Sequence, residues 1–135
     1  MLVVADASAI VEYLFRTERA QSVERIIVDP DVQLHAPALS DVEVLSACRR
    51  ATLRGKMDGN GAALVLSAYL DLPLVRHGHE MLVARALALR EDFTAYDAMY
   101  VALAEALGAT LLTADRRLVR AARRHTDLEV VSAAA

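Results

Sequence analysis

The spacing of apolar and polar residues along the chain predicts short strands separated by amphipathic helices. Brief apolar runs bounded by turn residues are typical of strands that are buried on both faces. We expect strands at residues 2–5, 33–35, 72–75, 109–112 and 128–131. Apolar residues that recur every three or four positions predict the helices between them. We expect helices at residues 8–15, 17–28, 40–53, 62–70, 79–90, 94–107 and 115–124.

Residues that commonly begin or end a helix support these boundaries. Ser40, followed three positions later by Glu43, forms the S-x-x-E pattern of a capping box. Thr94 is expected to cap the next-to-last helix, which Gly108 ends. Pro73 indicates an early or edge position for its strand. Strands alternating with helices predict an α/β fold, in which a mostly parallel sheet is covered on both faces.

The composition agrees with one domain over residues 1–135. Of these residues, 56% are hydrophobic and only 4% are aromatic, so the core must consist mainly of Ala, Val and Leu. The single cysteine, Cys48, lies in an apolar helical pattern and is expected to be buried. No apolar run approaches the length of a membrane-spanning helix, and we therefore expect a cytoplasmic protein.

The charge of the chain is unevenly distributed. Its formal net charge of −3 argues against a nucleic-acid-binding protein. Two basic groups nevertheless stand out, at Arg49, Arg50, Arg54 and Lys56, and at Arg116, Arg117, Arg120, Arg123 and Arg124. Such groups either contact phosphates or simply complement the dipole at the end of a helix, and the sequence leaves both interpretations open.

Four acidic residues stand at the ends of predicted elements. Asp6 and Asp115 each follow a strand, so both carboxylates should emerge at the edge of a parallel sheet where ligands bind. Glu43 and Asp97 lie in first helical turns, where acids also favour the helix dipole. If those helices run antiparallel to the strands, their N-termini lie at the opposite edge. The residues alone therefore allow either an acidic pocket or separate caps and turns.

The stretches VVADASAIVEYL, LSDVEVLSACRR and FTAYDAMYVALAEALGATLLTADRRL resemble the successive motifs of the PIN-domain family. Within that family the chain is most similar to the VapC-like ribonuclease toxins of bacterial toxin–antitoxin pairs. The resemblance spans the chain and implies a three-layer α/β/α sandwich with a central parallel sheet of about five strands. It also implies that the family's acidic quartet falls on Asp6, Glu43, Asp97 and Asp115.

The resemblance implies a metal-dependent endoribonuclease that hydrolyses single-stranded or looped RNA. Carboxylates without His or Cys partners suit Mg²⁺ or Mn²⁺. Asp6, Asp97 and Asp115 would be inner ligands, and Glu43 would bind a water on the metal or orient the nucleophile. The supporting residues implied are the hydroxyls Ser8 and Thr113, and the expected phosphate contacts are Arg116, Arg117 and Arg120. Arg116 and Arg117 stand where some relatives carry a further acid, which weakens the case for a second metal.

The family also implies a small antitoxin that covers the acidic site, and commonly a homodimer. A non-catalytic PIN-like scaffold is the alternative function. A magnesium-dependent phosphatase is disfavoured because Ser8 stands where that chemistry usually places a second acid. The aromatic side chains Phe93, Tyr96 and Tyr100 are expected in the core, and no chemistry is assigned to the four histidines.

Overall fold

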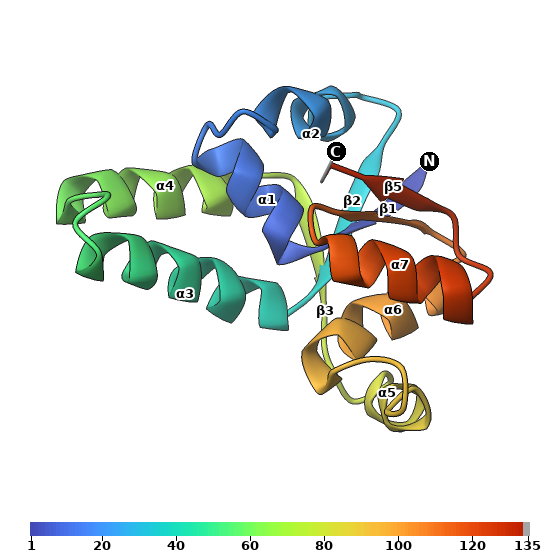
Figure 1. The fold of residues 1–135 in the computed structure, drawn as a ribbon. Coiled ribbons are helices and arrows are strands. Elements are labelled where there is room, and N and C mark those ends of the chain that lie inside the picture. Colours follow the sequence, from blue (N-terminus) through green and yellow to red (C-terminus); the bar gives the residue numbers. More distant parts are fainter. Residues whose placement is uncertain (134–135) are drawn as a thin grey trace.

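A parallel sheet with helices on both faces forms the protein, as seen in a computed structural model that describes residues 1–133 (Figure 1). The strands lie in the order β3-β2-β1-β4-β5, and every neighbouring pair is parallel. They are β1 (Leu2–Ala5), β2 (Gln33–Pro37), β3 (Leu74–His77), β4 (Thr110–Thr113) and β5 (Val130–Ser132). The predicted three-layer α/β/α sandwich is confirmed.

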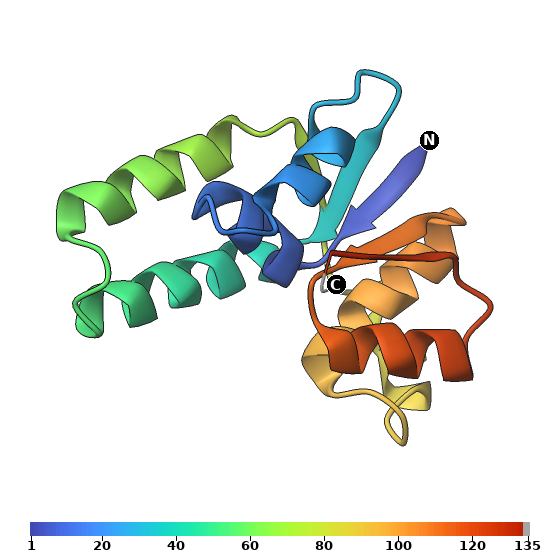
Figure 2. The same cartoon turned by 45° about the horizontal axis from the view of Figure 1, so that its top comes forward.

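Helices fill the connections between successive strands of the described residues. They are α1 (Ala7–Leu14), α2 (Ala20–Ile27), α3 (Leu39–Leu53), α4 (Gly59–Asp71), α5 (Val83–Ala88), α6 (Ala95–Leu107) and α7 (Arg116–His125). Crossovers between parallel strands are right-handed, so helices that lead in opposite directions along the sheet cover opposite faces. Accordingly, α1 to α4 lie on one face, whereas α5, α6 and α7 lie on the other (Figures 1 and 2).

The direction of the chain reverses at the middle of the sheet. From β1 it steps outward to β2 and β3, and it then returns to place β4 on the other side of β1. In this class of fold, ligands bind beyond the carboxyl ends of the strands at such a switch point. Ala5 is paired with Leu112, so the residues that follow β1 and end β4 stand at the same level.

The core is made of aliphatic strands and one central helix. Val3 and Val4 in β1 and Leu111 and Leu112 in β4 are buried, and α6 packs across β1, β2 and β4. Every residue of α6 from 98 to 104 is buried, which explains why this helix has no polar face there. Cys48 is buried as predicted.

Several predicted boundaries are wrong, and hydrogen bonds between residues distant in sequence accompany two of these differences. α3 begins at Leu39 with Ala38 before it, and Ser40 lies inside the helix, fully buried against Tyr69. The predicted capping box therefore does not form, because the Ser40 hydroxyl is used elsewhere. The prediction that Pro73 marks an edge strand is confirmed, since it directly precedes β3.

Two predicted helices are shorter than expected. α2 begins at Ala20 rather than at residue 17, after a turn in which Arg16 has a φ of 55°. The helix expected at residues 79–90 is reduced to α5, because His79 accepts a hydrogen bond from the Leu39 amide and holds the preceding loop. Among residues 1–133, none of the helices has the combined length and apolarity needed to cross a membrane.

Candidate active site

Asp6 stands at the start of α1 but does not cap it. Its backbone has the extended conformation of an N-cap residue, yet its side chain makes no capping hydrogen bond. The Asp6 amide continues the sheet by donating to the carbonyl of Leu112 (2.8 Å). The position therefore holds a buried carboxylate that the helix itself does not require.

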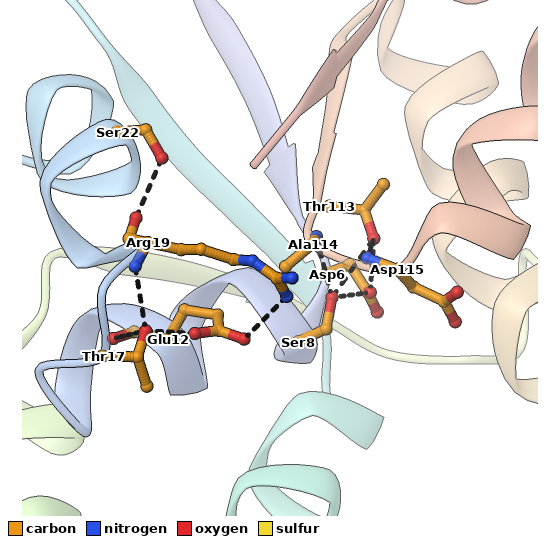
Figure 3. Close-up of polar contacts among 9 residues, drawn as sticks. All are labelled: Asp6, Ser8, Glu12, Thr17, Arg19, Ser22, Thr113, Ala114 and Asp115. Carbon is orange, nitrogen blue, oxygen red and sulfur yellow. Dashed lines mark hydrogen bonds and ion pairs between the residues drawn. The ribbon is translucent and has the colours of Figure 1, made fainter. Parts of the chain in front are cut away.

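Two hydroxyls bind the Asp6 carboxylate instead (Figure 3). Its Oδ2 accepts hydrogen bonds from Ser8 Oγ (2.5 Å) and from Thr113 Oγ1 (2.8 Å). The same hydroxyls accept from the amides of Ala114 and Asp115, each at 3.0 Å. The end of β4 is thus tied to the end of β1 through one carboxylate and two side-chain oxygens.

Asp115 follows β4 and does cap a helix. Its Oδ1 accepts from the amides of Arg117 (2.9 Å) and Leu118 (3.4 Å) in the first turn of α7. The expectation that Asp115 begins this helix is confirmed, with the residue at the N-cap rather than inside it. Its carboxylate is also partly exposed, and it lines the hollow described below.

Glu43 and Asp97 reach the site from two helices on opposite faces of the sheet. Asp97 lies in the first turn of α6, and its amide donates to the Thr94 side chain (3.1 Å), which caps the helix as predicted. Glu43 lies in the second turn of α3, and its Oε1 accepts a hydrogen bond from the Tyr100 hydroxyl (2.6 Å). Both carboxylates are half-buried.

One hollow of about 670 Å³ is lined by all four acids. The possibility that Glu43 and Asp97 lie at the opposite sheet edge is therefore wrong. A helix that follows a parallel strand begins at the carboxyl edge of that strand, and α3 starts directly after β2. α6 leads back into β4 and also begins at that edge.

The acids disturb one another electrostatically. Burial, and after it the charges of Asp6, Asp115 and Glu43 in that order of size, together raise the pKa of Asp97 to about 6. Burial also raises the pKa of Asp6, although the hydrogen bonds from Ser8 and Thr113 oppose this shift. Removing like charges from water in one hollow is costly, and a bound cation would relieve that cost.

The donor chemistry of the hollow fits a hard divalent cation. The acidic side chains offer only oxygen, which is the donor that Mg²⁺ and Mn²⁺ prefer. In the part of the chain that the structure describes, no three Asp, Glu, His or Cys side chains are already grouped as a metal site. Asp97 and Glu43 would hold such an ion together with Asp6 and Asp115.

The predicted phosphate contacts lie beside the hollow rather than in its lining. Arg116, Arg117 and Arg120 are exposed on α7. Arg116 lines a second hollow, of about 570 Å³, together with Arg19 and Arg25 of the α2 segment. Arg19 also contacts Glu12 of the acidic hollow (Nη1–Oε1, 3.6 Å), so the two hollows adjoin there (Figure 3).

Sequence reasoning did not place three side chains at or beside the site, although Arg50 was noted as part of a basic group. Arg50 lines the acidic hollow, and its charge lowers the pKa of Glu43 against the larger effect of burial. Its position two helical turns after Glu43 was the available signal. Arg19 gave no local signal. Tyr100 and Phe93 are in the core as predicted, whereas the same prediction is wrong for Tyr96, which is exposed. The Tyr100 hydroxyl contacts an acid, and its spacing of three residues from Asp97 was the signal.

Comparison with known proteins agrees with the fold. Residues 3–124 match the family model described as "PIN domain". Ribonuclease VapC12 of Mycobacterium tuberculosis is 37% identical over 131 residues, which cover 97% of this chain and 100% of that protein. Ribonuclease VapC3 of the same organism is 41% identical over 120 residues, which cover 88% of this chain and 86% of the relative.

Solved structures share the fold at low sequence identity. VapBC2 from Rickettsia felis, bound to a promoter DNA fragment, aligns with a TM-score of 0.72 at 13% identity and covers 98% of each chain. VapC20 of Mycobacterium tuberculosis, a Sarcin-Ricin loop cleaving toxin, aligns with a TM-score of 0.65 at 13% identity and covers 88% of this chain and 94% of that one. The matched motifs, the parallel sheet and the whole-length relatives together show that this chain belongs to the PIN-domain family, among the VapC proteins.

Proposed function

We propose that this protein is a Mg²⁺- or Mn²⁺-dependent endoribonuclease and the toxin of a toxin–antitoxin pair, acting as a single domain. The observation that carries the proposal is the grouping of Asp6, Glu43, Asp97 and Asp115 around one hollow, where three charges act on Asp97. The relatives VapC12 and VapC3, both named ribonucleases, support the reaction class.

Each acid has a proposed part in phosphodiester hydrolysis. A divalent ion, when bound, supplies Lewis-acid activation of water and neutralises developing negative charge. Asp6, Asp97 and Asp115 would bind the ion directly, and Glu43 would bind it through a water or orient the attacking water. Ser8 and Thr113 would keep the Asp6 carboxylate fixed and ionised, because hydrogen bonds to the charged form favour it.

The substrate we propose is single-stranded or looped RNA. Arg116, Arg117 and Arg120 would contact its phosphates, and the neighbouring Arg19 and Arg25 extend the same positive surface. An intact duplex is a poorer fit, because its stacked backbone cannot enter a hollow of this size without distortion. RNA in this position would lie between the positive surface and the acids.

We propose a small antitoxin as the protein partner, covering the acidic hollow, and a homodimer in the cytoplasm. Solved relatives include a toxin–antitoxin complex from Klebsiella pneumoniae, which aligns with a TM-score of 0.60. Large apolar side chains are exposed next to the hollow, at Val42 and Tyr96, and farther along α3 at Leu45. Such residues would be covered in an assembly.

The test is cleavage of structured RNA by the purified protein with Mg²⁺ or Mn²⁺, with and without EDTA. Asp6→Asn and Asp97→Asn should abolish cleavage while circular dichroism shows an intact fold. Asp58→Asn is the matched control, because Asp58 caps α4 away from the hollow and Asn also serves as a cap. Cleavage that survives EDTA, or full activity in both site variants, would refute the proposal; a folded protein that binds its partner without cleaving RNA would instead indicate a scaffold.

A further inference from the structure

Tyr100 is the buried side chain that contacts an acid of the hollow from the core. It lies in α6 and is fully buried, and its hydroxyl donates to Glu43 Oε1 at 2.6 Å. A buried tyrosine hydroxyl requires a hydrogen-bond partner, and a charged acceptor makes such a bond short and strong. The bond joins two helices that reach the site from opposite faces of the sheet.

Two further buried side chains with hydroxyl groups belong to the same region of the core. Ser40, one turn before Glu43 in α3, is fully buried and close enough to Tyr100 to influence its hydroxyl. The Tyr69 hydroxyl of α4 lies 3.0 Å from Ser40 Oγ and 2.5 Å from Asp41 Oδ1. Arg76 Nε donates to the same Asp41 oxygen at 2.7 Å.

This arrangement leaves Tyr100 little freedom to move. Its ring is enclosed in the core, and its hydroxyl is held by the hydrogen bond to Glu43. A glutamate in the second turn of a helix otherwise has several rotamers of similar energy. Tyr100 therefore restricts Glu43 to the rotamer in which one carboxylate oxygen accepts a hydrogen bond from the Tyr100 hydroxyl.

We propose that Tyr100 is the positioning residue for Glu43, fixing its carboxylate in the acidic hollow for metal binding and water orientation. The inference rests on the proposed function of the hollow. It adds a core residue to the site and gives different roles to two buried tyrosines. Tyr100 positions a residue of the reaction, whereas Tyr69 stabilises the packing of α3 against α4. Outer partners of metal ligands typically contribute a factor of about 10–100 in metal affinity or activity.

The test compares Tyr100→Phe with Tyr69→Phe, which removes an equally buried hydroxyl that does not contact an acid of the hollow. Mn²⁺ affinity is measured by electron paramagnetic resonance titration, and thermal unfolding is followed in EDTA. Tyr100→Phe should weaken Mn²⁺ binding about tenfold and lower kcat on RNA with an unchanged KM. Tyr69→Phe should leave the Mn²⁺ affinity within about twofold of the wild type, although it lowers thermal stability at least as much.

A double-mutant cycle distinguishes positioning from a general structural effect. In a Glu43→Ala background, Tyr100→Phe should cause no further loss of Mn²⁺ affinity. Equal losses in both backgrounds, or equal losses in the two tyrosine variants, would overturn the inference, as would a Tyr100→Phe protein with wild-type affinity and kcat. A wild-type protein that binds Mn²⁺ and cleaves RNA while Tyr100→Phe behaves normally refutes only this inference. A wild type that does neither refutes the proposed function as well.

Discussion

Asp6 and Asp115 occupy equivalent places at the ends of neighbouring parallel strands, yet their side chains make different contacts. Asp115 caps α7 with hydrogen bonds from two backbone amides, and it is partly exposed. Asp6 begins α1 without capping it, is buried, and is bound by Ser8 and Thr113. Asp115 therefore stabilises a helix whether or not the protein catalyses a reaction. Asp6 caps no helix, so no capping hydrogen bond offsets the free-energy cost of burying its carboxylate.

The difference shows how a fold keeps a costly group in place. Burial raises the pKa of Asp6, so its ionised form is disfavoured by its surroundings. Two hydroxyl donors offset part of that cost and also join β1 to β4. A buried, hydrogen-bonded carboxylate at a switch point is a feature that function explains better than stability does.

The largest expected effect is loss of RNA cleavage in both Asp6→Ala and Asp115→Ala. Each substitution removes a proposed metal ligand, so the loss of kcat/KM should exceed the roughly 10–100-fold that is typical for losing an outer partner. Single-turnover cleavage of a labelled RNA measures it. Near-normal cleavage by either variant would remove that aspartate from the site.

Removing the Ser8 or Thr113 hydroxyl should reduce RNA cleavage less than removing an aspartate. These hydroxyls bind the carboxylate of Asp6 and not that of Asp115. Ser8→Ala and Thr113→Val should each reduce cleavage about 10–100-fold, because the Asp6 carboxylate loses one donor. Thr94→Ser is the control, since it keeps a hydroxyl cap on α6. If Ser8→Ala cleaves RNA at the wild-type rate, the hydroxyls serve structure alone.

The stability of the two aspartate variants should differ in the absence of metal. The free energy of unfolding of Asp115→Ala should be about 1 kcal/mol lower than that of the wild type, because α7 loses its cap. Asp115→Asn should keep most of this free energy, because Asn also caps helices. Asp6→Asn should be at least as stable as the wild type, because a buried charge is removed and an amide can still accept from the hydroxyls. Urea unfolding in EDTA measures these values, and a larger loss for Asp6→Asn than for Asp115→Ala would contradict this explanation.

The crowded acids should make the metal-free protein more stable at mildly acidic pH. Asp97 has a pKa of about 6 in the folded protein against an ordinary value of 3.8. The folded state therefore binds its proton more tightly, and the stability rises as the pH falls through about 6 toward 4. Asp97→Asn should reduce this rise in urea titrations performed in EDTA. An unchanged pH profile in that variant would show that Asp97 is not the group responsible.

The smallest expected effect concerns the two arginines that follow Asp115 in the sequence. Replacing Arg116 and Arg117 with Ala should weaken RNA binding and lower the slope of log K against log salt by about 0.7 for each lost contact. Binding is measured in EDTA with the cleavage-deficient Asp97→Asn protein. Arg54→Ala, at the far end of α3, is the control. A slope equal to that of the control would refute the phosphate contacts.

The fold was predictable from the sequence because its signals are local. Apolar runs indicate the strands. Thr94 marks the start of α6 through its side-chain cap, and Gly108 marks its end through the left-handed backbone that glycine adopts easily. Asp6 and Asp115 were likewise identified from the strands they follow. The capping box predicted at Ser40 was wrong because the Ser40 hydroxyl is bound by Tyr69, which is 29 residues away. No local sequence pattern reveals such a contact.

The remainder of the site depends on contacts that are distant in sequence. Glu43 and Asp97 came from a family resemblance, since their position depends on how helices cross the sheet. The bond from Tyr100 to Glu43 spans 57 residues, and the bond from Thr113 to Asp6 spans 107. Pairings of that kind become visible only when the strands are placed in order. The catalytic roles of the four acids stay predictions until they are measured.

The most direct test of the central claim is the position of Mn²⁺ in crystals of the wild-type protein. Anomalous scattering from a Mn²⁺-soaked crystal should give a peak in the acidic hollow, within coordination distance of the Asp6 and Asp97 carboxylates. The same soak of Asp6→Asn crystals should give a much weaker peak. A strong peak elsewhere with the hollow empty, or an undiminished peak in Asp6→Asn, would contradict the account of this site.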